Sequence, residues 1–298
     1  MKPDTFKRVK PSHDLDIYRG VDMLGRDALL LITSSSPVAA KSSKSIEVIS
    51  GRRKDKKFSL MFSLRDARYV DIFDCFCKDI IGASEAQSVA DKDANIFFVN
   101  RYNKWAALFE KAPNDILSAE VVKGFIGEIL VLKNILIPRL GEVPSMQAWM
   151  GPLSAPQDFI FENSWVEVKT ISSSRDSVRI SSVEQLDSPN CGQMAIVRLD
   201  PSNIAERDSL GINDLAEEMV SSLRSPEARN LFEEKLLAVG YCFNKRYDDI
   251  RFSFKKIDLY SVSPDFPSIK RESIPPAILR VEYDISIPTI ENFKIEEP

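Results

Sequence analysis

Two carboxylates and a lysine lie close together near the middle of the chain and could act chemically as a group. Asp158 begins a short apolar run, and Glu167 and Lys169 follow within a second run rich in β-branched residues. Residues two apart on a strand face the same side, so Glu167 and Lys169 are expected to project together. A tight hairpin through residues 162–164 would bring Asp158 beside them.

These residue types favour hydrolysis of a phosphodiester by a metal ion. Two carboxylates in a small space repel each other, and a bound cation relieves the repulsion. Oxygen ligands with open coordination positions suit Mg²⁺ or Mn²⁺, which polarises a phosphoryl oxygen and lowers the pKa of a bound water. An ammonium beside that water can stabilise the hydroxide and the charge on phosphorus. By itself, however, a Glu-x-Lys pattern is more often an exposed ion pair.

A third acid, Glu128, lies at helical spacing from apolar neighbours in a helix predicted to begin after Ser118 and to end at Pro138. Its carboxylate falls on or beside the apolar face, where burial without a partner is costly. We expect it to be an additional metal or water ligand, and the alternative is a helix-edge glutamate reaching solvent. Gly124 and Gly127 each cost about 1 kcal/mol in a helix interior, which predicts close approach of another element there.

Gln185 follows a strand predicted at residues 178–180, in the first turn of a short helix. A capping box at residues 181–184 is expected to open that helix. The Gln185 amide could hydrogen-bond a phosphate, the attacking water or Lys169. The alternative is an exposed helix residue without a role.

The scarcity of histidine narrows the chemistry. His13 is the only histidine among 298 residues and lies in a polar segment, so a histidine general base or a Ser-His-Asp triad is poorly supported. The cysteines Cys75, Cys77, Cys191 and Cys242 lack the spacing of a zinc site. We expect them to be reduced, partly buried thiols of a cytoplasmic protein. No apolar run is long enough for a membrane span, and no secretory leader is expected.

The net charge of −4 does not by itself indicate a nucleic-acid-binding protein. A local cluster of cations begins with Arg52, Arg53 and Lys54. We interpret it first as a solvated hairpin turn and second as a loop that contacts phosphates of nucleic acid. Lys255 and Lys256, and also Lys270 and Arg271 near Arg280, could contact phosphates, but scattered surface charge is the preferred interpretation.

The elements that position these residues divide the chain into three parts. For residues 1–112 the pattern predicts a β meander followed by helices. Residues 113–200 are expected to form an α/β core around Asp158, Glu167 and Lys169, and residues 201–298 a helical and β extension. With 44% hydrophobic residues, the chain can bury a sizeable core. Strands are expected at residues 17–21, 28–32, 46–49, 58–62, 158–161, 165–170, 178–180, 194–199, 252–254, 257–262 and 278–285. Helices are expected at residues 70–81, 94–109, 212–223 and 226–239, besides the one that carries Glu128.

Several short motifs occur in an order that resembles one protein family. They are Gly-Phe-Ile-Gly-Glu-Ile-Leu at residues 124–130, Trp-Met-Gly-Pro at 149–152, Gln-Asp-Phe at 157–159, Glu-Val-Lys-Thr at 167–170 and Ile-Ser-Ser-Val-Glu-Gln-Leu at 180–186. Together they resemble the PD-(D/E)XK motif proteins of bacteria over most of the chain. One departure is Gln157, which precedes Asp158 where the pattern has proline, and Pro156 lies one step earlier. In this nuclease superfamily the residue at the proline position varies.

The resemblance implies an α+β fold with a restriction-endonuclease-like core and its site at a sheet edge. It implies a Mg²⁺- or Mn²⁺-dependent DNA endonuclease of a bacterial antiphage or restriction module. Asp158 and Glu167 would be metal ligands with Glu128 as accessory acid and ligand, Lys169 would activate water, and Gln185 would assist. The implied companions are a DNA methyltransferase, a Z1-domain ATPase and a GHKL ATPase, and homodimerisation is a further expectation. The alternative is a non-cleaving nucleic-acid-binding or assembly subunit on the same fold.

Overall fold

The computed structural model describes residues 2–110 and 116–295. The chain forms two compact units, of which unit 1 comprises Met1–Ile116 and Gly240–Phe243, and unit 2 comprises Leu117–Val239 and Asn244–Pro298. The expected boundary at residue 112 falls among residues 111–115, outside the described residues. The expected boundary at residue 200 falls within a strand of unit 2.

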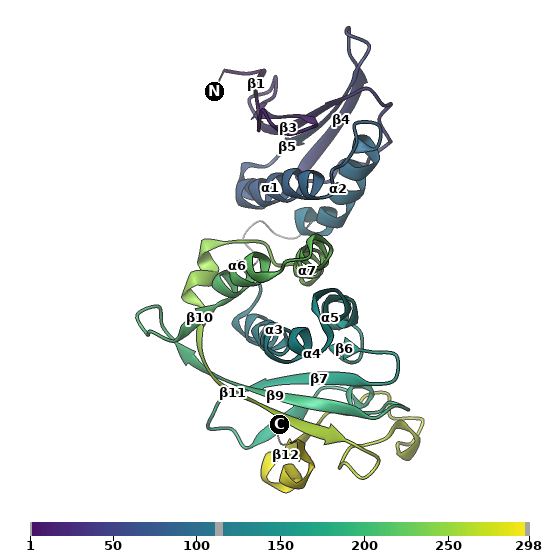
Figure 1. The fold of residues 1–298 in the computed structure, drawn as a ribbon, viewed down its shortest axis with the longest axis vertical. Helices are drawn as coiled ribbons and strands as arrows, with labels where there is room; N and C mark the ends of the chain where they lie inside the picture. The colour runs from purple at the N-terminus through teal and green to yellow at the C-terminus, as the bar shows by residue number, and fades with distance from the viewer. Residues whose placement is uncertain (1, 111–115, 296–298) are drawn as a thin grey trace. The chain divides into compact units, whose positions relative to one another are not determined.

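Unit 1 is a five-stranded antiparallel sheet with two helices against one face (Figure 1). Its strands are, in spatial order, β1 (Thr5–Arg8), β2 (Asp16–Val21), β3 (Asp27–Thr33), β5 (Phe58–Leu64) and β4 (Ile46–Arg52). Its helices are α1 (Val70–Ala86) and α2 (Ala94–Glu110). Phe62 of β5, Phe76 of α1 and Tyr102 of α2 form an aromatic core with ring centroids 5.1–6.1 Å apart. Burying these rings joins the sheet to both helices.

The helix expected at residues 70–81 is longer than predicted. Gly82 does not end α1, which continues to Ala86 and buries Ala83 and Ser84 beyond the glycine. His13 is buried, because Leu15 N donates to its Nδ1 at 3.0 Å and Ser84 Oγ lies 3.2 Å from its Nε2. The histidine is therefore a satisfied core residue of this unit.

Unit 2 contains a six-stranded mixed sheet in which β7 and β9 are parallel. Its strands are, in spatial order, β10 (Ser209–Gly211), β11 (Arg251–Val262), β9 (Gly192–Ser202), β7 (Trp165–Ile171) and β6 (Phe159–Ile160), and β13 (Lys294–Ile295) pairs with β11. The β9–β11 pairing runs from Ser202↔Arg251 to Gly192↔Val262. The expected core and much of the expected extension therefore share one sheet.

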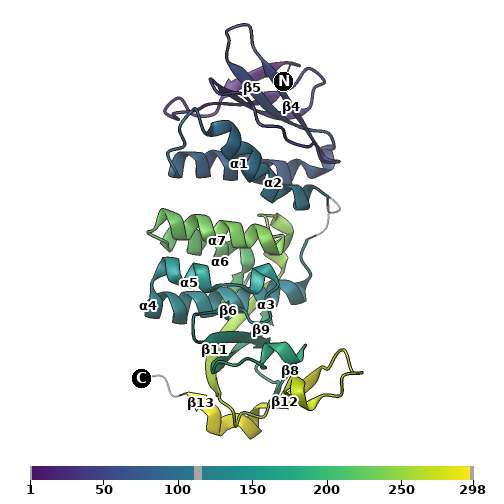
Figure 2. The ribbon, with the colours of Figure 1, turned by 90° about the vertical axis from the view of Figure 1, so that its right-hand side faces the viewer.

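Helices cover one face of this sheet (Figures 1 and 2). They are α3 (Ala119–Val131), α4 (Ile137–Leu140), α5 (Glu142–Ala148), α6 (Ile212–Ser222) and α7 (Pro226–Val239). The Ser118 hydroxyl caps α3 by accepting from Val121 N at 3.3 Å, as predicted. Pro138 does not end the helical segment, because a π turn at Leu132–Leu136 leads into α4 and the proline falls in the first turn of α4. A proline is tolerated at that position.

Two short paired strands, β8 (Ser177–Ile180) and β12 (Tyr283–Ser286), lie against the opposite face (Figure 2). The strand expected at residues 278–285 is thus shorter and later than predicted. Ile180 and Ile285 pack there with Ile171 of β7 and Ile196 of β9. Helices and sheets in both units make the fold α+β, as predicted. Within residues 2–110 and 116–295, no helix has the length and apolar character needed to cross a membrane.

Candidate active site

Strand β7 brings Glu167 and Lys169 together as a buried ion pair. Lys169 Nζ lies 2.7 Å from Glu167 Oε1, and the two side chains are 12% and 2% exposed. The exposed cross-strand ion pair is therefore the wrong interpretation. On the other side of β7, a Cβ added to Gly127 of α3 would lie 2.2 Å from Thr170 Oγ1. The close approach predicted at Gly127 is confirmed, whereas nothing lies within 4 Å of a Cβ at Gly124.

Asp158 reaches β7 from the residue before β6. Phe159 pairs with Val166, which sets the hairpin register. Asp158 Oδ2 accepts a hydrogen bond from Val168 N at 2.7 Å, so its carboxylate lies at the edge of β7, between the positions of Glu167 and Lys169. The predicted hairpin is confirmed, although β6 has only two residues.

Glu128 is held from α3 by a buried tryptophan. Trp149 Nε1 donates to Glu128 Oε2 at 2.7 Å, and the indole is 0% exposed. Its ring stacks on Phe125 at 5.3 Å and on Phe232 at 5.8 Å between centroids. The buried Lys235 of α7 donates to the carbonyl oxygen of Trp149. The orientation of Glu128 is therefore fixed by residues from three separate segments.

Gly151 is the point where two of the acids converge. A Cβ at this residue would lie 2.5 Å from Glu128 Oε2 and 2.8 Å from Asp158 Oδ1. The backbone N–H of Gly151 also donates to the Asp158 carbonyl at 2.9 Å. Sequence reasoning did not assign Trp149 or Gly151 to the site, and their only signal was the Trp-Met-Gly-Pro motif.

Gln185 contacts the lysine of the site directly. Its Oε1 accepts from Lys169 Nζ at 2.8 Å and from Ser181 N at 2.9 Å. Of the three partners considered, the structure shows Lys169. The predicted capping box is wrong, because the element is a 3₁₀ turn at Val183–Gln185 and the Ser182 side chain makes no capping bond.

Gln157, which replaces the expected proline, ties the Asp158 segment to the same 3₁₀ turn. Its Nε2 donates to the carbonyl oxygen of Glu184 at 2.6 Å, and the side chain is buried. A proline has no donor and could not make this bond. The glutamine therefore joins the segments that carry Asp158 and Gln185.

The three carboxyls all have raised pKa values. Burial, and then the charge of Asp158, raises the pKa of Glu167 to about 8 against the opposing effect of Lys169. Burial raises the pKa of Asp158 to about 6, although the Val168 N–H bond opposes the rise. Burial and the charge of Asp158 also raise the pKa of Glu128 well above its usual range, and the Trp149 hydrogen bond opposes this. The single positive charge of Lys169 is not enough to keep the carboxyls of Glu128, Asp158 and Glu167 all ionised.

A hard divalent cation would supply that charge, and three observations fit one. Glu167 Oε2 is buried and has no hydrogen-bond partner among the described residues. Gly151 places no side chain where oxygens of Glu128 and Asp158 converge. All-oxygen donors suit Mg²⁺ or Mn²⁺. Within the described part of the chain, no three His, Cys, Asp or Glu side chains are already gathered as a metal site, so binding an ion requires these side chains to close around it.

The cationic residues Arg52, Arg53 and Lys54 lie on the exposed β4–β5 hairpin of unit 1. Arg53 Nε pairs with Asp55 Oδ2 at 3.1 Å within the turn. The interpretation as a hairpin turn is confirmed, and contact with nucleic acid stays a prediction. Of the four cysteines, all free thiols, Cys191 is exposed rather than partly buried.

We expect Gly151→Ala to lower metal-dependent activity at least tenfold, because its methyl group would displace the buried carboxylates of Glu128 and Asp158. Gly124→Ala is the matched control, since it adds the same methyl group on α3 where nothing lies within 4 Å. The control should keep full activity and gain up to about 1 kcal/mol of stability. Initial cleavage rates and urea denaturation test both variants. Equal activity of Gly151→Ala and the wild type would contradict this geometry.

Trp149→Phe keeps an aromatic ring but removes the N–H that bonds Glu128 Oε2. A hydrogen bond to a charged group contributes about 1.5–3 kcal/mol, so the pKa of Glu128 should rise further. The acidic limb of the pH–rate profile should then move up by roughly one unit. Trp165→Phe is the control, since Trp165 Nε1 donates to the neutral carbonyl of Asn190 at 2.9 Å. That control should change stability and leave the pH profile unmoved. A profile that is identical in Trp149→Phe and the wild type would contradict the role of the indole.

Comparison with known proteins places the chain in a family. The model of a family described as "Putative PD-(D/E)XK family member, (DUF4420)" matches residues 3–288. No curated protein matches the chain, and no solved structure does. The family match spans both units, including all the residues of the candidate site.

Proposed function

Because the chain belongs to this PD-(D/E)XK family, DUF4420, we propose that it is a Mg²⁺- or Mn²⁺-dependent endonuclease that hydrolyses phosphodiester bonds in DNA. The α+β fold fits a restriction-endonuclease-like core, and PD-(D/E)XK proteins are generally nucleases that use divalent metals. The observation that carries the proposal is the buried pair of Glu167 and Lys169 beside Asp158, with one Glu167 oxygen unbonded by any residue of 2–110 or 116–295.

Each residue of the site has a distinct task in this proposal. Asp158, Glu167 and Glu128 would hold the ion, which when bound polarises a phosphoryl oxygen and acidifies a coordinated water. Lys169 places a positive charge beside Glu167, where it can stabilise the hydroxide and the charge developing on the phosphoryl oxygens. Gln185 Oε1 accepts from Lys169 Nζ and so positions that charge. The chemistry needs no histidine.

The raised carboxyl pKa values predict how the metal-free protein responds to pH. Between the ordinary pKa of Glu167, 4.5, and its folded value of about 8, the folded state binds more protons than the unfolded state. The free energy of unfolding should therefore fall as the pH rises through this window, by on the order of a few kcal/mol. Mn²⁺ added at pH 8 should restore stability, because it binds the ionised acids of the folded state. Urea denaturation in EDTA and in Mn²⁺ measures both effects, and a metal-free stability that rises over this window would contradict the burial of the acids.

We extend the proposal to a biological setting from the resemblance of the motifs. The enzyme would act in a bacterial antiphage or restriction-type defence system. Its companions would include a DNA methyltransferase, a Z1-domain ATPase and a GHKL ATPase. Co-purification of the tagged chain with such proteins tests this part separately from the chemistry.

One observation favours a second function, that of a non-cleaving nucleic-acid-binding or assembly subunit. Among the described residues, the acids are not already gathered around a metal position. Incubation of the purified chain with plasmid and Mg²⁺ or Mn²⁺ decides between the two functions. Nicking or linearisation by the wild type, lost in Asp158→Asn, supports the nuclease. DNA binding without cleavage in either metal supports the subunit.

A further inference from the structure

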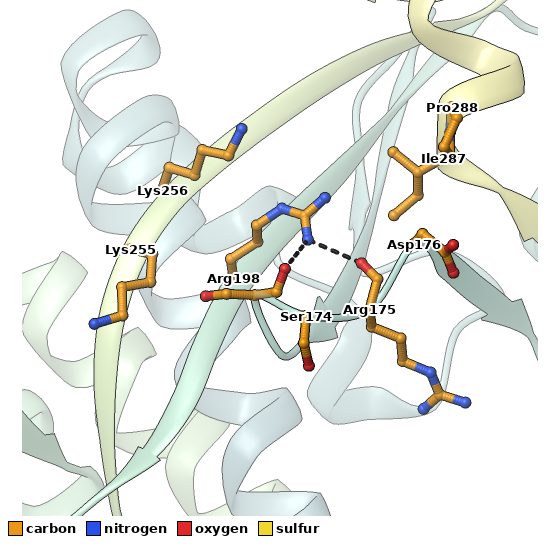
Figure 3. A pocket seen from close by; sticks show the side chains of 9 residues that line it. Ser174, Arg175, Asp176, Arg198, Lys255, Lys256, Ile287 and Pro288 are labelled. Carbon is orange, nitrogen blue, oxygen red and sulfur yellow. Dashed lines mark hydrogen bonds between the residues drawn. The ribbon is translucent and has the colours of Figure 1, made fainter.

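A pocket outside the acidic site lies at the carboxyl end of β7 (Figure 3). Its volume is about 470 Å³, and its lining includes the loop at residues 173–176, which follows β7 directly. Four of its lining residues are cations, namely Arg175, Arg198, Lys255 and Lys256, and one is an acid, Asp176. The fold thus gathers Lys255 and Lys256 with two arginines, which scattered surface charge does not explain.

Arg198 forms the fixed part of the pocket. Its Nη1 donates to the carbonyl oxygens of Ser173 at 3.2 Å and Arg175 at 3.0 Å, which holds the loop against β9 (Figure 3). Its Nε lies 3.7 Å from Asp258 Oδ2, and the side chain is 13% exposed. None of the contacts of Arg198 with the described residues uses Nη2. The guanidinium therefore keeps a donor for a ligand in a fixed orientation.

Of the residues that the structure describes, three acids lie beside the pocket, fewer than the cations around it. Asp258 pairs with Lys256 at 2.9 Å and with Lys294 at 3.0 Å. Asp200 accepts from the backbone N–H of Ser173 at 2.7 Å and also from its hydroxyl. Asp176 is exposed on the pocket wall. The pocket therefore keeps an excess of positive charge.

Two of the cations make no ion pair with the described residues. Lys255 Nζ donates to the neutral Ser253 Oγ at 2.8 Å. The Arg175 side chain is exposed and extends from the loop (Figure 3). Both can turn toward an anion without breaking a salt bridge. Flexible cations beside a fixed guanidinium suit recognition of phosphate oxygens.

The pocket lies on the face of the sheet that carries Glu167 and Lys169. In the parallel pairing of β7 and β9, Lys169 is opposite Ile196 and Ile171 is opposite Arg198. Alternation along both strands puts Lys169, Ile171, Ile196 and Arg198 on one face. Arg198 lies on the neighbouring strand β9, two residues further along the sheet than Lys169. This offset corresponds to about 8 Å between the Cα atoms of the two residues. Ile171 and Ile196 between the two sites are covered by β8 and β12, so a polyanion engaged at Lys169 would pass over these strands to reach the pocket.

We propose that this pocket binds a backbone phosphate of the nucleic acid, a short distance along the strand from the phosphate that is cleaved. The inference rests on the proposed function and deepens it by naming a second contact with the same substrate. The ligand chemistry is a phosphodiester anion, and a free phosphate or a nucleotide has similar charge. The pocket would fix the register of the strand, because phosphate contacts position a nucleic acid without reading its sequence.

The test compares two double variants of the full chain that remove the same charge. Arg175→Gln with Lys255→Gln removes the two unpaired cations of the pocket, and Arg139→Gln with Arg207→Gln removes two exposed cations of unit 2 outside it. Fluorescence anisotropy in EDTA measures binding of a labelled DNA duplex, and of its single strand, over a salt series. The pocket variant should bind roughly tenfold more weakly near 0.1 M salt, with a log–log salt slope shallower by about 1–2. The control should resemble the wild type.

Several outcomes would overturn the inference. One is equal affinity and salt slope in the pocket variant and the control. Another is weaker binding of inorganic phosphate by calorimetry with unchanged DNA binding, which would assign the pocket to a small anion. Failure of the nuclease proposal looks different, since wild-type protein would then bind DNA through the pocket and cleave none of it in Mg²⁺ or Mn²⁺.

Discussion

Lys169→Met should lower the rate of metal-dependent DNA cleavage by about 10²–10⁴-fold, the range for loss of a positioned acid–base or electrostatic group. Methionine keeps most of the length of the side chain and removes the ammonium that contacts Glu167 at 2.7 Å and Gln185 at 2.8 Å. Metal binding should survive but move to higher pH, because the ammonium that opposes the rise in the pKa of Glu167 has been removed. Single-turnover cleavage and calorimetry with Mn²⁺ separate the two effects.

The control for this variant is Lys133→Met. Lys133 is 33% exposed and pairs with Glu218 of α6, so its replacement removes one ammonium of unit 2 outside the site. It should cleave at the wild-type rate. If Lys169→Met cleaved within about threefold of the wild type, Lys169 would not be the charge that assists the reaction.

Glu167→Gln should weaken Mn²⁺ binding by at least about 100-fold and abolish cleavage, because the amide supplies only one neutral oxygen. It should also flatten the pH dependence of metal-free stability, since the group whose pKa is about 8 has been removed. Both effects come from one buried carboxylate, whose Oε2 accepts no hydrogen bond within the part of the chain that the structure describes.

Calorimetry with Mn²⁺ and urea denaturation at several pH values test this variant. Glu184→Gln is the matched control, because its carboxylate is exposed and the substitution keeps the backbone carbonyl that accepts from Gln157. It should bind Mn²⁺ and cleave as the wild type does. Unchanged Mn²⁺ affinity in Glu167→Gln would remove this residue from the metal site.

The strands and helices with clear periodicity were predictable from the sequence. The alternation in Glu-Val-Lys at residues 167–169 and the short hairpin before it predict the side-by-side placement of three polar groups, and the structure has them so. The predicted start of α7 at residue 226 also holds, and Ser225 Oγ accepts from Ala228 N there at 3.3 Å. These features depend on local backbone geometry, which residue type and spacing determine.

The parts that the sequence did not predict depend on distant contacts. The hydrogen bond from Trp149 to Glu128 joins residues from different helical segments, and Lys235 supports it from α7. Gly151 beside two carboxylates has no periodicity that marks it. Residues on both sides of position 200 belong to one sheet because β9 pairs with β11. No local sequence pattern specifies that pairing.

The most direct measurement is anomalous diffraction from crystals of the wild-type protein soaked in Mn²⁺ near pH 8. We expect one strong manganese peak bounded by the carboxylates of Glu128, Asp158 and Glu167, with oxygen ligands at about 2.0–2.4 Å and with Lys169 beside it. Absence of a peak among these residues at saturating Mn²⁺, with Lys169 still paired to Glu167 as in the metal-free arrangement, would contradict it.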